Sequence, residues 1–174
     1  CVCTSNKELV ARHGQELMKL AAQKGVNYMF EASCGGGIPI IRPLNSSLTA
    51  DEIDEISGIL NGTTNYILTE MAEKYRDFDT VLKEAQELGY AERNPEADVE
   101  GYDACRKIAI LSSLAYGSHV DYEKVYTEGI TKITVEDMKY ANAMGMSIKL
   151  LATSKRKDNR FYAMVSPVLV GKDS

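Results

Sequence analysis

The sequence has few of the residues on which metal and triad chemistry depend. Its two histidines, His13 and His119, lie far apart and have no companion ligands nearby, which argues against a zinc site or a Ser-His-Asp triad. The four cysteines form no C-x-x-C pair, and we expect them to be reduced thiols of a cytoplasmic protein. No apolar run approaches the roughly 20 residues that a membrane span needs, and no secretory signal is visible.

The sequence also has too little positive charge for a protein whose main partner is nucleic acid or an anionic membrane. Its 20 basic and 25 acidic residues give a net charge of −5. Neither a G-x-G-x-x-G fingerprint nor a P-loop occurs, and the D-x-[DN]-x-[DN]-G order of a calcium loop is missing. The 174 residues, of which 44% are hydrophobic, are enough for one good core and a fragment of a second.

The chain begins with Cys1-Val2-Cys3-Thr4, which has the composition of a strand end, and we expect the sequence to be a piece of a longer protein. Caps and apolar periodicity predict helices over 6–25, over 66–72 after a turn at 61–65, over 78–88, from 98 or 99 to 116, and over 135–144. A short helix over 40–44 is expected to break at Pro43. Strands are predicted over 27–33, 52–60, 125–127, 148–153 and 161–170, with a polar hairpin loop over 154–159.

The order of these elements predicts an α/β fold of the mixed α+β kind. A helix, a strand and then Gly35-Gly36-Gly37 are typical of the tail of a parallel nucleotide-binding sheet. Helices packed on one face of a mixed β-sheet are the simplest architecture for the rest of the chain.

Most of the ionisable groups that could form a site fall in the stretch 89–107. Asp103 and Lys107 are four residues apart and would share one face of a helix, while Glu92 and Asp98 come shortly before them. Carboxylates can hold an ammonium group. A lysine can move a proton at a hydroxyl or carbonyl oxygen, if its pKa of about 10.4 is lowered by burial or water shares the proton. The stretch is therefore a candidate site for a small zwitterion.

Spacing alone leaves two interpretations of these residues open. In a purely structural one, Asp98 caps a helix, Asp103 and Lys107 form an exposed pair that contributes about 0.3–0.5 kcal/mol, and Glu92 is solvated. In a functional one, the same groups line a cleft. The glycine loop has the same ambiguity, because it permits either a tight turn or a close approach of backbone to a ligand. Lys7, at a helix start, would be an ordinary surface lysine on the structural interpretation.

Four segments, in the same order, resemble motifs of the homoserine dehydrogenase family. They are Thr4-Ser5-Asn6-Lys7, the loop E-A-S-C-G-G-G-I-P-I over 31–40, the segment G-I-L-N-G-T-T-N-Y-I-L over 58–68, and the stretch 89–107. Two short segments, Glu128-Gly129-Ile130 and Ile148-Lys149-Leu150-Leu151, also resemble sequence motifs of the family, so the resemblance runs nearly end to end. Ser5 and Cys34 depart from it, because the family usually has alanine and valine there.

The resemblance implies an oxidoreductase that interconverts L-homoserine and L-aspartate 4-semialdehyde, in threonine, methionine and isoleucine biosynthesis, with NAD or NADP carrying the hydride. By the same resemblance, Lys107 passes the proton to or from the substrate oxygen. Glu92 and Asp103 bind the amino acid, and Asp98 supports that cluster.

The resemblance also implies where the cofactor and a cation bind. Lys7 would lie beside the nicotinamide and help to order cofactor and substrate, and Gly89 would approach the cofactor through its backbone. A monovalent cation such as sodium would be held by oxygen ligands, which suit a hard cation. Those ligands would be the Glu31 carboxylate and the backbone carbonyls of Cys34, Gly36 and Ile38.

The domain organisation implied is a stub of the nucleotide-binding domain over 1–32 and a substrate-binding, catalytic and dimerisation domain over 33–174. A homodimer with a small amino-acid substrate is expected. Because the sequence has no phosphate-binding glycine loop, the preference between NAD and NADP is not specified, and we expect this chain alone to be inactive.

Two other functions compete with this one. A semialdehyde dehydrogenase that uses a cysteine thioester needs a thiolate paired with a histidine, and neither Cys34 nor Cys105 has a histidine near it in the sequence. A stand-alone amino-acid-binding or dimerisation module without catalysis would differ from a dehydrogenase in having no nucleotide-binding half upstream.

Overall fold

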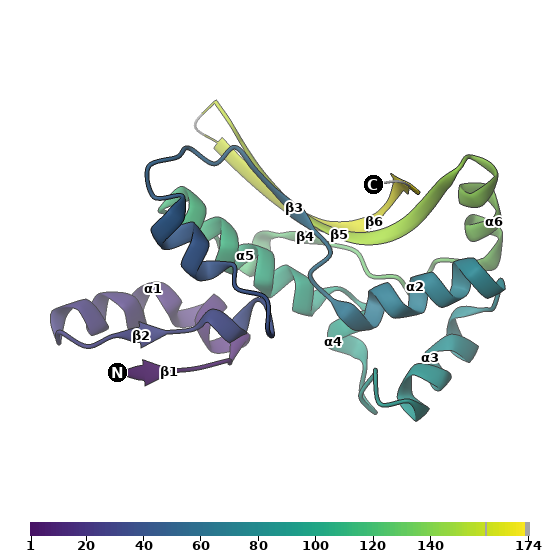
Figure 1. The fold of residues 1–174 in the computed structure, drawn as a ribbon, viewed down its shortest axis with the longest axis horizontal. Coiled ribbons are helices and arrows are strands. Elements are labelled where there is room, and N and C mark those ends of the chain that lie inside the picture. Colours follow the sequence, from purple (N-terminus) through teal and green to yellow (C-terminus); the bar gives the residue numbers. More distant parts are fainter. Residues whose placement is uncertain (159, 173–174) are drawn as a thin grey trace. The chain divides into compact units, whose positions relative to one another are not determined.

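The computed structural model describes residues 1–158 and 160–172 (Figure 1). The chain divides into two compact units, each made of three segments. The first unit comprises Cys1–Ile56, Cys105–Val125 and Thr153–Met164, and the second comprises Ser57–Ala104, Tyr126–Ala152 and Val165–Ser174. Among the described residues, no helix combines the length and apolar character that crossing a membrane requires.

The first unit starts with a strand, a helix and a strand. They are β1 (Val2–Cys3), α1 (Lys7–Gln23) and β2 (Tyr28–Met29). The two strands pair in parallel, with Val2 opposite Tyr28 and Cys3 opposite Met29, as the tail of a parallel sheet requires. The strand predicted over 27–33 is wrong beyond Met29, where the 3₁₀ helix η1 (Glu31–Ser33) replaces it. The Ser33 hydroxyl donates to the carbonyl of Phe30 at 2.6 Å and holds this turn.

Capping residues fix the ends of α1, which the sequence predicted. The Asn6 side chain accepts the N–H of Leu9 at 2.9 Å. Gly25, with a φ of 62°, supplies the left-handed residue after the helix. The helix predicted over 6–25 is therefore confirmed.

The short helix predicted over 40–44 does not break at Pro43. Pro43 begins the π-helical segment η2 (Pro43–Ser47), and Arg42 before it already has helical dihedral angles. A proline in the first turn of a helix removes only an N–H that lacks an intrahelical partner, so the segment continues through it.

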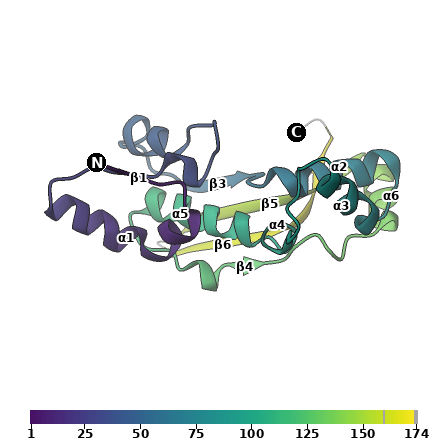
Figure 2. The same cartoon turned by 90° about the horizontal axis from the view of Figure 1, so that it is seen from below.

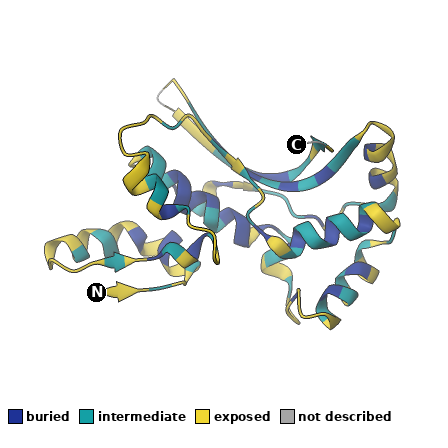
Figure 3. Cartoon of the chain, viewed as in Figure 1, coloured by how far each residue is buried: buried dark blue, intermediate teal, exposed yellow. Residues whose placement is uncertain are grey.

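The second unit contains α2 (Gly62–Lys74), against which three other helices pack. They are α3 (Phe78–Glu87), α4 (Glu96–Val99) and α6 (Val135–Ala143). Ile67, Leu68 and Met71 of α2 are completely buried, and Figure 3 shows the buried positions of this helix. Burying each such side chain stabilises the fold by about 1.5–3 kcal/mol. The helices predicted over 66–72, 78–88 and 135–144 are confirmed, with α2 starting at its Asn61 cap.

The long helix predicted from Asp98 or Val99 to Tyr116 is in fact two helices, α4 and α5 (Tyr102–Tyr116). Gly101 interrupts it with a φ of 82°, a conformation that other residues adopt only at a cost of about 1–2 kcal/mol. A Cβ at this position would also lie 3.2 Å from a methyl carbon of Thr127 and 3.3 Å from one of Val165. The apolar pattern runs through the break, so periodicity alone did not reveal it. In the first unit, α5 is followed by the 3₁₀ helix η3 (Tyr122–Lys124).

The larger sheet has four strands, in the spatial order β3 (Glu55–Gly58), β5 (Met146–Lys157), β6 (Arg160–Gly171) and β4 (Tyr126–Thr127). Figure 2 shows the four strands side by side. Ile148, Leu150 and Ala152 are buried at alternate positions of β5, as one covered face requires. The predicted α/β fold with a mixed sheet and helices is confirmed.

Two predicted boundaries in this sheet are wrong. The strand predicted over 52–60 is shorter, and the loop predicted over 154–159 is strand as far as Lys157. The backbone N–H of Arg156 donates to the carbonyl of Asp54 at 2.7 Å, which keeps β5 paired beyond Thr153. Asp158, with a φ of 49°, follows in the turn, and Asn159 lies outside the described residues.

Candidate functional site

The side chain of Asn61 joins two of the predicted acidic residues in the second unit. Its amide nitrogen donates to Oδ1 of Asp98 at 2.7 Å and to Oδ2 of Asp103 at 3.0 Å. Asn61 is 6% exposed and Asp103 is 3% exposed, so both lie almost out of reach of water. A carboxylate pair in such a place can hold a cationic group through charge-assisted hydrogen bonds.

Asn61 is placed by the start of α2. Its Oδ1 accepts the backbone N–H of Thr64 at 2.8 Å and the Thr64 hydroxyl at 2.9 Å, which caps the helix. One turn further on, the Lys149 ammonium of β5 donates to Asn65 Oδ1 and Thr69 Oγ1, each at 2.9 Å. Burial lowers the pKa of Lys149, and the nearby charge of Glu73 opposes this shift. These contacts attach the first two turns of α2 to β5.

The two aspartates are placed by the junction between α4 and α5. The N–H of Ile130 donates to the carbonyl of Val99 at 2.8 Å, and Ile130 itself is completely buried. At Gly129, an added Cβ would lie 2.2 Å from the Val99 carbonyl oxygen, so the two backbones could not approach this closely with any other residue. The Glu128-Gly129-Ile130 segment therefore holds the junction that separates Asp98 from Asp103.

This geometry bears on the structural interpretation of the aspartates. Asp98 lies in α4 and does not cap the long helix, and Asp103 is buried, so the structural interpretation as an exposed Asp103–Lys107 pair is wrong for Asp103. Lys107 is half-buried on α5, four residues after Asp103, and its backbone carbonyl accepts the Cys34 thiol at 3.9 Å within the first unit. Glu92 is exposed.

Gly89 and Glu92 lie on the loop that follows α3. Gly89, with a φ of 78°, ends the helix, as its position in the sequence predicts. The Thr63 hydroxyl donates to the carbonyl of Tyr90 at 2.8 Å, and the Gln86 amide donates to that of Glu92 at 3.0 Å. The loop is thus tied to the first turn of α2, where Asn61 also lies.

The loop predicted to hold a cation lies in the first unit. The Glu31 carboxylate accepts three backbone N–H groups, from Ile40 at 2.6 Å and Ile41 at 2.9 Å on Oε1 and from Arg42 at 2.8 Å on Oε2. Burial raises the pKa of Glu31, but these hydrogen bonds outweigh it, so the pKa lies below its ordinary value. Oε2 keeps acceptor capacity for a cation.

Gly35 shows how tightly this loop is folded. A Cβ at Gly35 would lie 2.3 Å from the Ile38 carbonyl oxygen, so only glycine lets that carbonyl turn back over the loop. Cys34 is buried, and Gly36 and Ile38 are exposed. Carbonyl oxygens of this loop and the remaining capacity of Glu31 fit a hard cation. In the same unit, Lys7 is half-buried in the first turn of α1.

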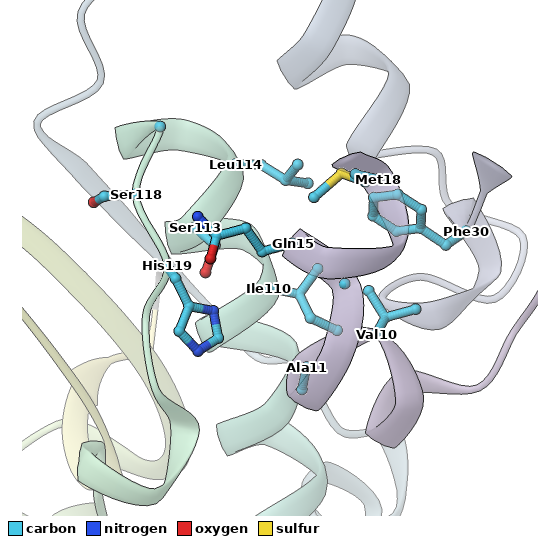
Figure 4. Close-up of a pocket in the computed structure, with 12 residues that line it drawn as sticks. Val10, Ala11, Gln15, Met18, Phe30, Ile110, Ser113, Leu114, Ser118 and His119 are labelled. Atoms are coloured by element: carbon cyan, nitrogen blue, oxygen red, sulfur yellow. The ribbon is translucent and has the colours of Figure 1, made fainter. Parts of the chain in front are cut away.

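A separate apolar pocket of about 240 Å³ lies in the first unit. Figure 4 shows side chains of α1, among them Val10 and Met18, together with Ile110 and Leu114 of α5. His119 and Ser113 add polar groups to its wall. The lining differs from the set of residues predicted from the sequence, so the pocket and the carboxylate pair are distinct features.

Sequence reasoning missed Asn61 as a member of the site. The motif that contains it, Asn61-Gly62-Thr63-Thr64-Asn65, predicts a turn into a helix, which accounts for the cap of α2 but not for the bonds to the aspartates. Its other partners are 37 and 42 residues away in the sequence. The only local signal was an asparagine at a helix cap.

Comparison with known proteins adds an independent line of evidence. The family model described as homoserine dehydrogenase matches residues 39–174. The chain is 48% identical to the homoserine dehydrogenase of Pseudomonas aeruginosa over 172 residues, which cover 99% of this chain and 40% of that protein. It is 45% identical to the one of Bacillus subtilis, covering 97% and 39%.

Solved structures agree with the sequence comparison. A homoserine dehydrogenase from Thiobacillus denitrificans superposes with a TM-score of 0.96 at 48% identity, covering 99% of this chain and 40% of that one. A hyperthermophilic archaeal homoserine dehydrogenase in complex with NADPH superposes with a TM-score of 0.84 at 30% identity, covering 99% and 49%. The chain therefore spans about two fifths of the length of the curated relatives it matches.

Proposed function

The chain belongs to the homoserine dehydrogenase family, and on this basis we propose that it forms the substrate-binding and catalytic part of a homoserine dehydrogenase. The observation that carries the proposal is the pair of carboxylates held by one amide, the buried Asp103 and the half-buried Asp98. The proposed division is residues 1–32 as the end of a nucleotide-binding domain and 33–174 as the substrate-binding and dimerisation domain.

Glu92 and Asp103 bind the amino acid in this proposal, with Asp98 supporting them. An ammonium group has a positive charge and three donors, which match carboxylate oxygens. The buried position of Asp103 and the tied loop of Glu92 support this role. The side chain of the amino acid then carries the reacting alcohol or aldehyde.

Lys107 moves the proton at the reacting oxygen of the substrate. When the alcohol is oxidised, its hydroxyl proton passes to Lys107 directly or through water, and the reverse reaction returns it. NAD or NADP, when bound, accepts or supplies the hydride. Lys7 and the backbone of Gly89 are the groups of this chain proposed to order the nicotinamide, and NADPH is what the archaeal relative binds.

The glycine loop has a supporting role in the proposal. Glu31 and the carbonyls of Cys34, Gly36 and Ile38 would hold a monovalent cation such as sodium. The closeness of the Ile38 carbonyl to Gly35 supports this role, because it gathers backbone oxygens in a short loop. The working form of the protein is proposed to be a cytoplasmic homodimer.

The proposal is tested by assaying the full-length protein that the natural gene encodes. With L-homoserine and NAD or NADP, it should form reduced nicotinamide, which absorbance measures directly. A full-length protein that binds L-homoserine and does not oxidise it would favour the alternative, an amino-acid-binding or dimerisation module without catalysis.

The 174-residue chain provides a second test. Since its sequence has no phosphate-binding glycine loop, we expect it to be folded and dimeric but inactive, as circular dichroism, light scattering and the same assay would show. Homoserine oxidation by this chain alone would contradict the proposed division of the cofactor site.

A further inference from the structure

Asn61 is the member of the site to which the proposed reaction gives no role. We infer that Asn61 is a positioning residue, which holds the carboxylate of Asp103 in place to receive the amino group of the substrate and fixes its separation from the supporting carboxylate of Asp98. The inference rests on the proposed function, because that function supplies the ammonium ligand.

The start of α2 determines which way the Asn61 amide points. The backbone N–H of Thr64 can only donate, so the atom of Asn61 that lies 2.8 Å from it must be the oxygen. The amide nitrogen then faces the opposite way, and each of its two N–H groups has one carboxylate partner, Asp98 or Asp103. With the Thr64 hydroxyl on the oxygen as well, all four hydrogen-bonding positions of the side chain are used.

A planar amide fixes the directions of its two N–H groups, and so it fixes where the two carboxylates lie. The two negative groups are close together, and water screens Asp103 little, because Asp103 is 3% and its partner Asn61 6% exposed, while Asp98 is half-buried. The neutral amide offsets part of the repulsion between them. A ligand ammonium offsets more, because it adds a full positive charge.

Other helix caps of the chain show that capping alone does not require a buried asparagine. Asp77 caps α3 by accepting from Thr80, and Asn6 caps α1 by accepting from Leu9, and both caps are exposed. Serine, aspartate or asparagine would cap α2 about equally well. Of these, only asparagine both caps the helix and donates to two carboxylates.

Asn61→Asp in the full-length protein separates these two roles. Aspartate has the same size and keeps the cap, but it replaces the donor with a third carboxylate facing the pair. We expect the KM for L-homoserine to rise about tenfold or more, while kcat and the KM for the nicotinamide cofactor change less than about threefold. The acid limb of kcat/KM should move to higher pH, because three adjacent carboxylates retain a proton more strongly than two.

The matched control is Asp77→Asn, which exchanges the same two residue types at the exposed cap of α3. Its kinetic constants and pH profile should equal those of the wild type. An Asn61→Asp protein that loses thermal stability but keeps the wild-type KM and pH profile would reduce Asn61 to a helix cap and overturn the inference. A wild-type protein that does not oxidise L-homoserine would instead contradict the proposed function.

A pH titration of the Asn61 side-chain amide tests, without any turnover, whether this amide faces the two carboxylates. In full-length protein labelled with nitrogen-15 asparagine, both side-chain amide protons of Asn61 should shift as the pH falls through the range where carboxylates titrate. The amide protons of Asn142, which face the hydroxyl of Tyr75, should shift much less. Asn61 protons that do not respond would overturn the inference even in an active enzyme.

Discussion

Gly129 is the position where a single methyl group should disturb the carboxylate site most directly. In a Gly129→Ala protein, the new Cβ would lie 2.2 Å from the Val99 carbonyl oxygen and 2.5 Å from the Cα of Glu100. Both neighbours are backbone atoms, so no side-chain rotation relieves the overlap. The two segments must separate, and the hydrogen bond from Ile130 N–H to the Val99 carbonyl, now 2.8 Å long, must lengthen with them.

Two costs add up in this substitution. Overpacking a filled interior costs about 1–3 kcal/mol, and a weakened backbone hydrogen bond adds about 1 kcal/mol. We therefore expect the free energy of unfolding to fall by about 2–4 kcal/mol. In a domain of this size each kcal/mol lowers Tm by about 2–4 °C, so Tm should fall by roughly 5–15 °C.

Thermal unfolding followed by circular dichroism measures this change in the 174-residue chain. Gly58→Ala is the matched control, since a Cβ at Gly58 would have no atom within 4 Å. The control should change the unfolding free energy by less than about 1 kcal/mol. A Gly129→Ala protein whose Tm stays within about 2 °C of the wild type would show that the two backbone segments separate without lowering the free energy of unfolding. That result would refute this reasoning.

Three further predictions concern single side chains. Lys107→Ala in the full-length protein should lower kcat by about 100-fold or more and change the KM for L-homoserine much less, because the lysine is proposed to move a proton. A kcat near that of the wild type would show that Lys107 does not transfer the proton. Glu31 has a lowered pKa in the folded chain, so its carboxylate stabilises the fold above the unfolded pKa of about 4.3, and this contribution is lost as the pH falls through the lower folded value. Urea unfolding between about pH 6 and pH 3 should therefore show a shallower loss of stability for Glu31→Gln than for the wild type, and equal slopes would contradict it. Leu68→Ala, at a completely buried position, should lower the unfolding free energy by about 2–5 kcal/mol in the same urea assay, whereas Leu88→Ala, where the side chain is 57% exposed, should change it little.

Local signals in the sequence predicted the helices well. Asn6, Gly25 and Gly89 mark helix ends, because a cap or a left-handed glycine acts within a few residues of where it stands. The order of the elements predicted the fold class, and the resemblance to the family indicated which residues to locate. The helix-capping role of Asn61 could be predicted for the same reason, because a cap depends only on nearby residues.

Long-range packing explains what the sequence did not reveal. Gly101 divides the predicted long helix because Thr127 and Val165 pack against it, and neither residue is near it in the chain. The second role of Asn61, its hydrogen bonds to Asp98 and Asp103, likewise depends on how α2 packs against the α4–α5 junction. β5 runs past its expected end because Arg156 pairs with Asp54, a partner that strand propensity does not identify.

The central claim is that the carboxylates of Glu92 and Asp103, supported by Asp98, receive the amino group of a hydroxylated amino acid. It is tested most directly by comparing the full-length protein on L-homoserine and on 4-hydroxybutanoate, which is the same molecule without the amino group. The account predicts oxidation of L-homoserine with a kcat/KM at least about 100-fold higher than that for 4-hydroxybutanoate, because 4-hydroxybutanoate has no ammonium group to donate to these carboxylates. Equal kcat/KM values for the two compounds would contradict it.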